Sequence, residues 1–410
     1  MLTQPLKVYI VGGAVRDALL DQPVQDKDFV VVGNTHEQML EAGFTQVGAD
    51  FPVFLHPDSN AEYALGRTER KSGKGYQGFS VHASPEVTLE EDLARRDLTI
   101  NAMAQQVVGL FDDTPVDDEI IDPYGGQTDL KNGVLRHVSE AFCEDPLRVL
   151  RLARFYGRFS GASYSQNFQI ADGTVALVKQ MIEAGELEHL TPERVWTETA
   201  RALMQEAPFA YIQCLQNLGA LAVLMPTLAP VIKNQVTAQT LNDRLQKLAR
   251  IQPPLEVRWA GLMLGFALAH STDGNALPHL EESALTDWLK NVKALSNRLK
   301  LPNKISKFSE LMVASYPHAL TFSGNDSDNQ AYHIASLIQM SKADKDRSQL
   351  LNLLRLFIIY GLSIDEDEFE KAIDAYSHVT IIDIDASLKG AEIGEALWQK
   401  RIERIEHSLN

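Results

Sequence analysis

Residues 7–32 read KVYIVGGAVRDALLDQPVQDKDFVVV, and this stretch decides the fold of the first third of the chain. Two runs rich in β-branched residues, 7–11 and 28–32, predict short buried strands. Gly12-Gly13 ends the first run, and residues 14–20 have the composition of a helix. Further along, 52–55 and 62–65 predict two more strands. A strand, a glycine turn and a helix in succession predict an α/β or α+β domain.

The Gly12-Gly13 turn is a candidate phosphate site. Glycine backbone lets an anion approach closely, and the first N–H groups of a helix point toward such an anion. Arg16 lies in the first turn of the predicted helix and adds a positive charge. The segment lacks the lysine and Ser/Thr of a P-loop and the spacing of GxGxxG, so neither common nucleotide fingerprint applies.

Asp26 and Asp28 precede the apolar run FVVV, and residues i and i+2 of a strand project to the same face. Two adjacent carboxylates repel each other, and a divalent cation relieves the repulsion. Hard oxygen ligands favour Mg²⁺. A solvated turn before a strand is the simpler alternative, which the upstream glycine turn disfavours. A two-metal site often uses a third carboxylate; Glu62 and Glu69 both qualify, and the sequence does not choose between them.

Basic residues gather at 67–74 (RTERKSGK) and 95–97 (RRD). Residues 71–78 contain three glycines and predict a loop. The pattern Thr88-x-x-Glu91 predicts a capping box that starts a short helix ending near Arg96. These cations could form a solvated face. Alternatively, they contact a triphosphate, while Asp97 and Asn101 hydrogen-bond sugar hydroxyls.

The segment EDPLRVLR, residues 144–151, is a candidate base-reading element. Asp145 caps a helix that Pro146 begins, and Asp145, Arg148 and Arg151 are three residues apart on one side. A plain cap and a surface ion-pair series are the alternatives. Ionised Asp only accepts hydrogen bonds and Arg only donates them, so a fixed pair suits cytosine and adenine. Uracil and guanine present the opposite polarity and leave buried groups unpaired.

The composition limits the class of protein. The chain has 410 residues, which predicts more than one domain, and a net charge of −17, which is unlike a protein that coats nucleic acid. Cys143 and Cys214 are too few for a disulfide scaffold. We find no signal peptide and no membrane-spanning run, and we expect a soluble cytoplasmic protein. After residue 140 the pattern is helical, with 379–384 (VTIIDI) as a strand-like exception.

Five motifs occur in order: GGAVRD (12–17), DKD (26–28), RRDLTINA (95–102), EDPLRVLRLARF (144–155) and LTPERVWTE (190–198). With them the chain resembles the bacterial class II CCA-adding enzymes, which are tRNA nucleotidyltransferases, closely over residues 1–200. The resemblance implies an α+β fold. A polymerase-β-like head with a small, mostly parallel or mixed sheet (1–139) is followed by a helical neck that recognises the nucleotide (140–205). A helical body and tail that bind tRNA complete the chain (206–410).

The resemblance also implies roles for individual residues. Asp26 and Asp28 hold Mg²⁺ and are catalytic. Nucleotide binding, of ATP or CTP, falls on Gly13, Arg16, Arg96, Asp97, Asp145, Arg148 and Arg151. Gly12, Asn101, Glu62 and Glu69 are further candidates. The expected substrates are CTP, ATP and tRNA, with no membrane partner and with a monomer favoured.

One departure from the resemblance lies in the second half. Many relatives carry a phosphohydrolase domain with a His-Asp dyad in a stretch resembling VRFATLCHDLGK. Here residues 257–268 read VRWAGLMLGFAL, so Leu264 and Gly265 replace the dyad. We therefore predict no metal-dependent phosphatase or phosphodiesterase activity. A poly(A) polymerase, a CC- or A-adding specialist and an inactive RNA-binding homologue are the alternative functions.

Overall fold

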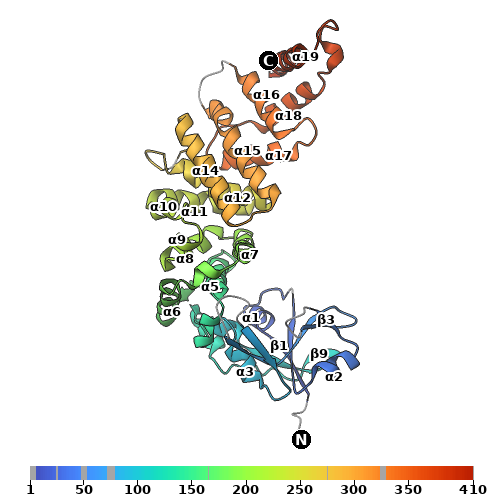
Figure 1. The fold of residues 1–410 in the computed structure, drawn as a ribbon, viewed down its shortest axis with the longest axis vertical. Helices are drawn as coiled ribbons and strands as arrows, with labels where there is room; N and C mark the ends of the chain where they lie inside the picture. Colours follow the sequence, from blue (N-terminus) through green and yellow to red (C-terminus); the bar gives the residue numbers. More distant parts are fainter. Residues whose placement is uncertain are drawn as a thin grey trace. The chain divides into compact units, whose positions relative to one another are not determined.

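The computed structural model describes residues 6–24, 26–47, 53–71, 79–164, 166–274, 276–323 and 329–409, with backbone only at 69–71, 79–83 and 323. The chain divides into two compact units (Figure 1). The first comprises Met1–Glu198 with Asn217–Leu224, and the second comprises Thr199–Gln216 with Met225–Asn410. The finer division into head, neck, and body with tail stays a prediction.

The first unit contains a sheet with the strand order β3-β4-β5-β2-β1-β8-β9. Within the described chain, β2 and β5 are its parallel pair, and the other neighbours are antiparallel. This mixed sheet agrees with the predicted α+β class, but it is mostly antiparallel, so the mostly parallel alternative is wrong. The strands are β1 (Lys7–Val11), β2 (Asp28–Val32), β3 (Thr45–Val47), β4 (Val53–Leu55), β5 (Glu62–Leu65), β8 (Ala104–Gly109) and β9 (Asp112–Pro115). A separate hairpin pairs β6 (Arg67–Lys71) with β7 (Phe79–Ala83).

Helix α3 (Leu89–Ala94) covers the face of the sheet on which Asp28 lies. The predicted capping box is formed: the Glu91 N–H donates to Thr88 Oγ1 at 3.2 Å, and the Thr88 N–H donates to the Glu91 carboxylate at 2.9 Å. Leu89 and Leu93 pack against Val30 and Val32. These two valines lie on the same face of β2 as Asp28. The chain therefore leaves α3 at Arg95 on the carboxylate side of the sheet.

The first unit contains further elements besides this sheet. They are α1 (Gly13–Leu19), α2 (His36–Glu41), the 3₁₀ turn η2 (Thr99–Asn101), α4 (Gly126–Asn132), β10 (Val134–Leu135), η3 (Glu140–Glu144), α5 (Leu147–Phe159), β11 (Gln169–Ile170), α6 (Asp172–Glu183), η4 (Glu186–His189), α7 (Pro192–Leu203) and α9 (Ala220–Leu224). Helix α7 begins at the predicted Thr191-Pro192 signal and ends in the second unit.

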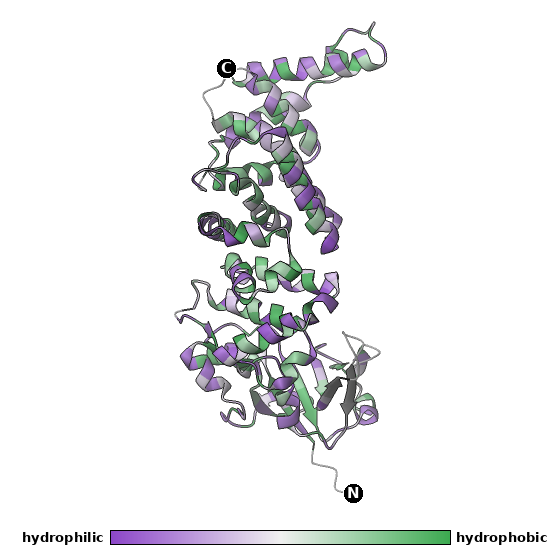
Figure 2. Ribbon diagram, turned by 60° about the vertical axis from the view of Figure 1, so that its left-hand side comes forward, coloured by the Kyte–Doolittle hydropathy of each residue, from purple (hydrophilic) through white to green (hydrophobic). Residues whose placement is uncertain are grey.

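The second unit is helical throughout its described residues. Its elements are α8 (Pro208–Leu218), α10 (Ala229–Lys233), α11 (Gln235–Arg250), α12 (Leu255–Met263), α13 (Gly265–Leu268), α14 (Glu282–Arg298), α15 (Asn303–Leu320), η5 (Thr321–Ser323), α16 (Gln330–Ser341), α17 (Ser348–Ile359), α18 (Glu366–Ser377), η6 (Ile381–Asp383) and α19 (Ala391–Leu409). Apolar and polar residues alternate along most of these helices (Figure 2). The strand-like reading of 379–384 is wrong, because Thr380 and Asp383 form a capping box that closes a 3₁₀ turn there.

Leu264 and Gly265 occupy the positions at which many relatives carry the His-Asp dyad. Both are buried in the helical core of the second unit. A Cβ added at Gly265 lies 2.8 Å from Leu241 Cδ1, so this position is closely packed by aliphatic side chains. Nearby, the Arg258 guanidinium donates to the carbonyl oxygens of Leu203 (2.8 Å) and Gln205 (3.0 Å). This segment therefore has a packing role in the unit.

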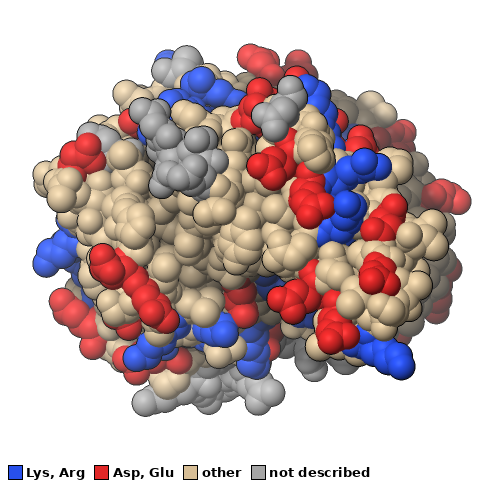
Figure 3. Space-filling model, turned by 90° about the horizontal axis from the view of Figure 1, so that it is seen from above, with Lys and Arg blue, Asp and Glu red and all other residues tan. Residues whose placement is uncertain are grey.

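On the face drawn in Figure 3, acidic and basic side chains are intermixed around an uncharged area. Among the described residues, no helix combines the length and the apolar composition needed to cross a membrane.

Gly126, the first residue of α4, is fixed by close packing against η2. A Cβ at this position lies 2.3 Å from the carbonyl oxygen of Thr99, and Thr99 Oγ1 donates to Asp129 Oδ2 of α4 at 2.7 Å. The first turn of α4 therefore supports the segment that carries Asn101.

We expect Gly126→Ala to lower the free energy of unfolding by about 1–3 kcal/mol, because the added methyl group overpacks a buried contact. Gly173→Ala is the matched control, since an added Cβ there meets no atom within 4 Å in the described structure. That control should be neutral or stabilising by up to about 1 kcal/mol. Chemical denaturation monitored by circular dichroism measures both. Equal unfolding midpoints for the two variants would contradict the packing argument.

Candidate active site

The strand register places two carboxylates at one edge of the sheet, and a third, Asp26, precedes the strand there. Asp28 opens β2 and is paired with Val11 on one side and Glu62 on the other. Asp26, Asp28 and Glu62 are exposed and line an open cavity of about 770 Å³. None of the three forms an ion pair with another described residue. The register places Glu62 beside Asp28, and both line the cavity with Asp26, but the described residues contain no convergent group of three acidic metal ligands. The side chain of Glu69 and residues 72–78 lie outside what is described.

The cavity has an acidic group that the sequence did not single out. Asp113 of β9 also lines it, and Lys27 Nζ lies 2.6 Å from Asp113 Oδ2. Lys27 is the middle residue of the DKD motif, precedes β2, and lines the same cavity as Asp26 and Asp28. Asp113 therefore neutralises the cation and leaves the oxygens of Asp26, Asp28 and Glu62 as the hard donors that suit Mg²⁺.

Gly12 follows β1 directly beside Asp28. Its φ of 67° lies in the left-handed region, and a Cβ there meets Arg96 Nη1 at 2.7 Å. The first glycine of the motif is thus required by backbone conformation and by the close approach of Arg96. Gly13 begins α1, where an added Cβ makes only an ordinary contact of 3.5 Å with Arg16.

Arg96 is held by a buried carboxylate that the sequence analysis did not select. Asp92 of α3 is fully buried and pairs with Arg95 Nη2 at 3.0 Å and with Arg96 Nη2 at 3.4 Å. Burial opposes the ionisation of Asp92, but the two guanidinium groups hold its pKa below the usual range. The Arg96 pKa is lowered by burial, with Asp92 and Asp28 opposing that shift.

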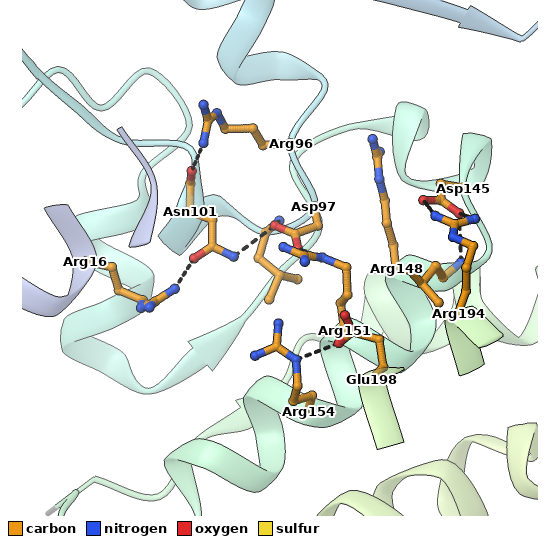
Figure 4. Close-up of polar contacts among 12 residues, drawn as sticks. Arg16, Arg96, Asp97, Asn101, Asp145, Arg148, Arg151, Arg154, Arg194 and Glu198 are labelled. Atoms are coloured by element: carbon orange, nitrogen blue, oxygen red, sulfur yellow. Dashed lines mark hydrogen bonds and ion pairs between the residues drawn. The ribbon is translucent and has the colours of Figure 1, made fainter. Parts of the chain in front are cut away.

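Asp97 is the centre of the polar network in Figure 4. Its carboxylate accepts hydrogen bonds from Asn101 Nδ2 (2.9 Å), Arg151 Nε (2.7 Å) and the Leu98 N–H (2.9 Å). Burial raises the pKa of Asp97, but Arg151 and these hydrogen bonds outweigh burial and hold it well below the usual range. Asp97 thereby joins the end of η2 to helix α5.

Arg16 enters the same network from the other side. Its guanidinium is buried, donates to Asn101 Oδ1, and pairs with Asp17 at 2.8 Å. It also lies over the ring of Phe155, 5.0 Å from the ring centroid. Arg151 and Arg154 approach the same ring at 5.9 and 4.6 Å, so one buried aromatic contacts three cations.

Asp145 has a different partner from the expected one. Helix α5 begins at Leu147 and its cap residue is Pro146, so Asp145 lies one residue before the cap and the predicted cap position is wrong by one residue. Asp145 Oδ1 still accepts a hydrogen bond from the Leu147 N–H at 3.0 Å. The carboxylate is held by both terminal nitrogens of Arg194 from α7, at 3.1 and 2.7 Å. Arg148 instead donates to the Ala141 carbonyl oxygen at 2.6 Å. In Figure 4 Arg148 extends between the Asp97–Arg151 and Asp145–Arg194 pairs.

Sequence reasoning therefore found most of the polar residues that gather here. It missed Asp92, Asp113 and Arg194 as partners. Arg194 lies in the LTPERVWTE motif, so its place in a recognised motif was the available signal. Asp92 directly follows the glutamate of the capping box, but its position in a predicted helix does not indicate that its side chain is buried.

Comparisons with known proteins agree with this geometry. The model for the Poly A polymerase head domain matches residues 8–136, and the probable RNA and SrmB-binding site of polymerase A matches 167–232. The multifunctional CCA protein of Pseudomonas aeruginosa (strain PAO1) is 40% identical over 98% of each chain. That of Pseudomonas fluorescens (strain Pf-5) is 48% identical over 76% of this chain and 74% of the relative.

Solved structures support the fold. A CCA-adding enzyme with ATP superposes with a TM-score of 0.64 at 22% identity, covering 98% of this chain and 86% of that chain. The Thermotoga maritima CCA-adding enzyme complexed with tRNA CCA has a TM-score of 0.60 at 22% identity, covering 98% and 91%. These likenesses confirm the predicted polymerase-β-like head followed by helical regions. With the end-to-end identity to the Pseudomonas proteins, they establish that the chain belongs to the CCA-adding family of tRNA nucleotidyltransferases.

Proposed function

We propose that this chain adds C, C and A to the 3′ end of tRNA from CTP and ATP, without a nucleic-acid template. The 3′-hydroxyl oxygen attacks the α-phosphorus, a new O–P bond forms, and pyrophosphate leaves. One observation carries the proposal. The exposed carboxylates lie next to the network of arginines, and this network extends to α5, the candidate base-reading helix. This arrangement favours CCA addition over an inactive RNA-binding role, since exposed carboxylates alone would hinder RNA binding. We infer a cytoplasmic location from the tRNA substrate and from the two free cysteines.

Asp26 and Asp28 are the proposed metal ligands, and Glu62 is the candidate for a third carboxylate. Their oxygens are exposed, lie at one sheet edge, and have no ion-pair partner among the described residues. Bound there, Mg²⁺ lowers the pKa of the attacking hydroxyl and offsets the charge of the leaving pyrophosphate. The carboxylates orient this site, while Gly12 and Gly13 leave room for phosphate beside Asp28.

The arginines and Asp97 are the proposed nucleotide-binding groups. Arg96 lies next to the glycine turn and is the cation placed to meet the triphosphate. Arg16 is buried, so we assign it to holding Asn101 and the first turn of α1. The hydrogen bonds of Asp97 hold the side chains of Asn101 and Arg151 in place. The remaining hydrogen-bonding groups of these two side chains therefore have fixed positions from which they can bind the sugar and the base.

Asp145 and Arg148 are the proposed template for the base. A carboxylate offers about four lone-pair sites, and the Arg194 fork and one backbone N–H occupy three of them. The remaining acceptor can meet the amino group of cytosine or adenine. Arg148 uses one N–H for Ala141 and keeps its other donors for the ring nitrogen. Arg194 thus fixes the acceptor half of the template.

Substitution of the carboxylates tests the metal assignment. Asp26→Asn and Asp28→Asn should lower kcat for CTP incorporation by at least about 10³-fold, because developing phosphate charge loses its stabilisation, and tRNA binding should stay nearly intact. Glu62→Gln should reduce kcat more than Glu69→Gln does. Near-normal activity of either aspartate variant, or a larger loss at Glu69, means that the ligand set is wrong. Incorporation of labelled CTP into tRNA lacking its CCA end is the measurement.

Substitution of Arg194 tests the template. Arg194→Ala should lower kcat/KM for CTP by about 10–100-fold and increase misincorporation of UTP, because Asp145 loses a two-point partner. Arg194→Lys should be intermediate, since an ammonium supplies charge without the fork. Arg201→Ala, on the exposed side of the same helix, is the control. Unchanged discrimination between CTP and UTP in Arg194→Ala contradicts this role.

The second unit should not hydrolyse phosphate esters. We expect no cleavage of p-nitrophenyl phosphate or bis(p-nitrophenyl) phosphate above the enzyme-free blank with Mg²⁺, Mn²⁺ or Ni²⁺. The reason is that buried Leu264 and Gly265 provide no ligand for a metal. The same preparation must extend tRNA, which shows that it is folded. Metal-dependent hydrolysis by this preparation would overturn the prediction.

A further inference from the structure

Helix α5 meets helix α1 in an ion pair that the proposed mechanism does not use. Arg158 Nη2 donates to Asp17 Oδ1 at 3.0 Å, and both side chains are half-buried. Arg158 Nε donates to the Tyr164 hydroxyl at 2.9 Å, and the guanidinium lies near the rings of Phe159 and Tyr164, about 6 Å from each centroid. Arg158 is therefore held in one orientation, with a terminal nitrogen directed at Asp17.

Asp17 shares one carboxylate oxygen between two arginines. Its Oδ1 accepts from Arg16 Nε at 2.9 Å as well as from Arg158, and Arg16 Nη2 lies 2.8 Å from the same atom. Burial lowers the pKa of Arg16; Asp17 opposes that shift, and the positive charge of Arg158 adds to it. The carboxylate thus stabilises the buried Arg16 guanidinium and connects it to α5.

These contacts close a ring of hydrogen bonds that begins and ends on α5. We call it the α5 ring, and its members are, in order, Arg158, Asp17, Arg16, Asn101, Asp97 and Arg151. Arg151 and Arg158 are seven residues apart in the sequence. This spacing is about 10 Å, or two turns, so both lie on the same side of the helix. Helix α1 and turn η2 are therefore attached to α5 at two points.

The ring connects two parts of the site that must act on one nucleotide. Helix α5 carries Arg148 in its first turn, and α1 begins at the Gly12-Gly13 turn. A single attachment, the Asp97–Arg151 pair, would let α5 rotate about that point, and the second attachment prevents this rotation. The relative position matters because a displacement of the reacting atoms by about 1 Å can lower a rate by about 10²-fold.

We propose that Asp17 and Arg158 are positioning residues for nucleotide transfer. This inference rests on the proposed function, which makes α5 the base-reading helix. By holding α5 against α1, the pair keeps the base template at a fixed distance from the glycine turn. Recognition of the correct base then places the α-phosphorus at the carboxylates. The pair acts through these elements and does not itself contact the nucleotide.

Arg158→Met tests this role, because it removes the charge and keeps a long side chain against Phe159 and Tyr164. We expect the single-turnover rate of CTP addition to fall about 10–100-fold, while the CTP concentration at half-maximal rate changes by less than about threefold. The reason is that misplacement of reacting atoms affects the transition state more than ground-state binding. The ratio of the rates for CTP and UTP should also fall, because base reading no longer determines where the phosphate lies.

Two further substitutions test whether the pair acts as a unit. Asp17→Asn should slow CTP addition as Arg158→Met does, and the double variant should be no slower than either single variant. Arg158→Lys should recover part of the rate, since an ammonium can still pair with Asp17. Tyr164→Phe is the matched control, because it removes the other hydrogen-bond partner of Arg158 and keeps the ion pair. Its rate should be that of the unsubstituted enzyme.

The outcomes separate this inference from the proposed function. An unsubstituted enzyme that adds no nucleotide to tRNA rejects both. If that enzyme is active, an unchanged rate in Arg158→Met, or additive losses in the double variant, rejects the positioning role alone. A lower unfolding midpoint with a normal rate per folded molecule shows that the pair only stabilises the fold. Circular dichroism at the assay temperature measures the folded fraction, and if Arg158→Met is unfolded there, Arg158→Lys and Asp17→Asn decide.

Discussion

The buried carboxylate of Asp97 is the constraint on which the rest of the site depends. A buried charge is tolerated only when it is paired and hydrogen-bonded. Asp97 meets this condition with Arg151 at 2.7 Å and Asn101 at 2.9 Å, one from helix α5 and one from η2. Because Asn101 in turn accepts from Arg16, satisfying one charge fixes groups from three separate elements. Removing any partner leaves another polar group unpaired, so the network is held as a unit.

The carboxylate edge depends on a simpler constraint, which is strand register. Pairing Asp28 with Val11 and with Glu62 places a glycine turn and two acidic side chains at the same sheet edge. A slip of one residue would turn Asp28 to the opposite face. All four residues after Asp28 are buried, with Val30 and Val32 under α3, so such a slip would displace side chains that are packed on both faces of β2. Packing of the core thus fixes where the exposed carboxylates lie.

The second unit shows how a helical core and a charged surface are divided. Leu264 and Gly265 lie within the core, where Gly265 leaves room for Leu241. The cations Lys290, Lys293 and Lys304 lie on the exposed surface of helices α14 and α15. The strong negative charge of the chain therefore does not describe every surface, because electrostatic attraction depends on where the charges lie.

The sequence by itself determined the local elements and the order of the motifs. The strands at 7–11 and 28–32 and the capping box at Thr88 and Glu91 follow from propensities and from hydrogen bonds between near neighbours. The partners of the charged groups were decided only by tertiary structure. Asp145 pairs with Arg194, which is 49 residues away, and Lys27 pairs with Asp113, which is 86 residues away. Short-range patterns specify backbone conformation, whereas such ion pairs exist only after packing has brought distant elements together.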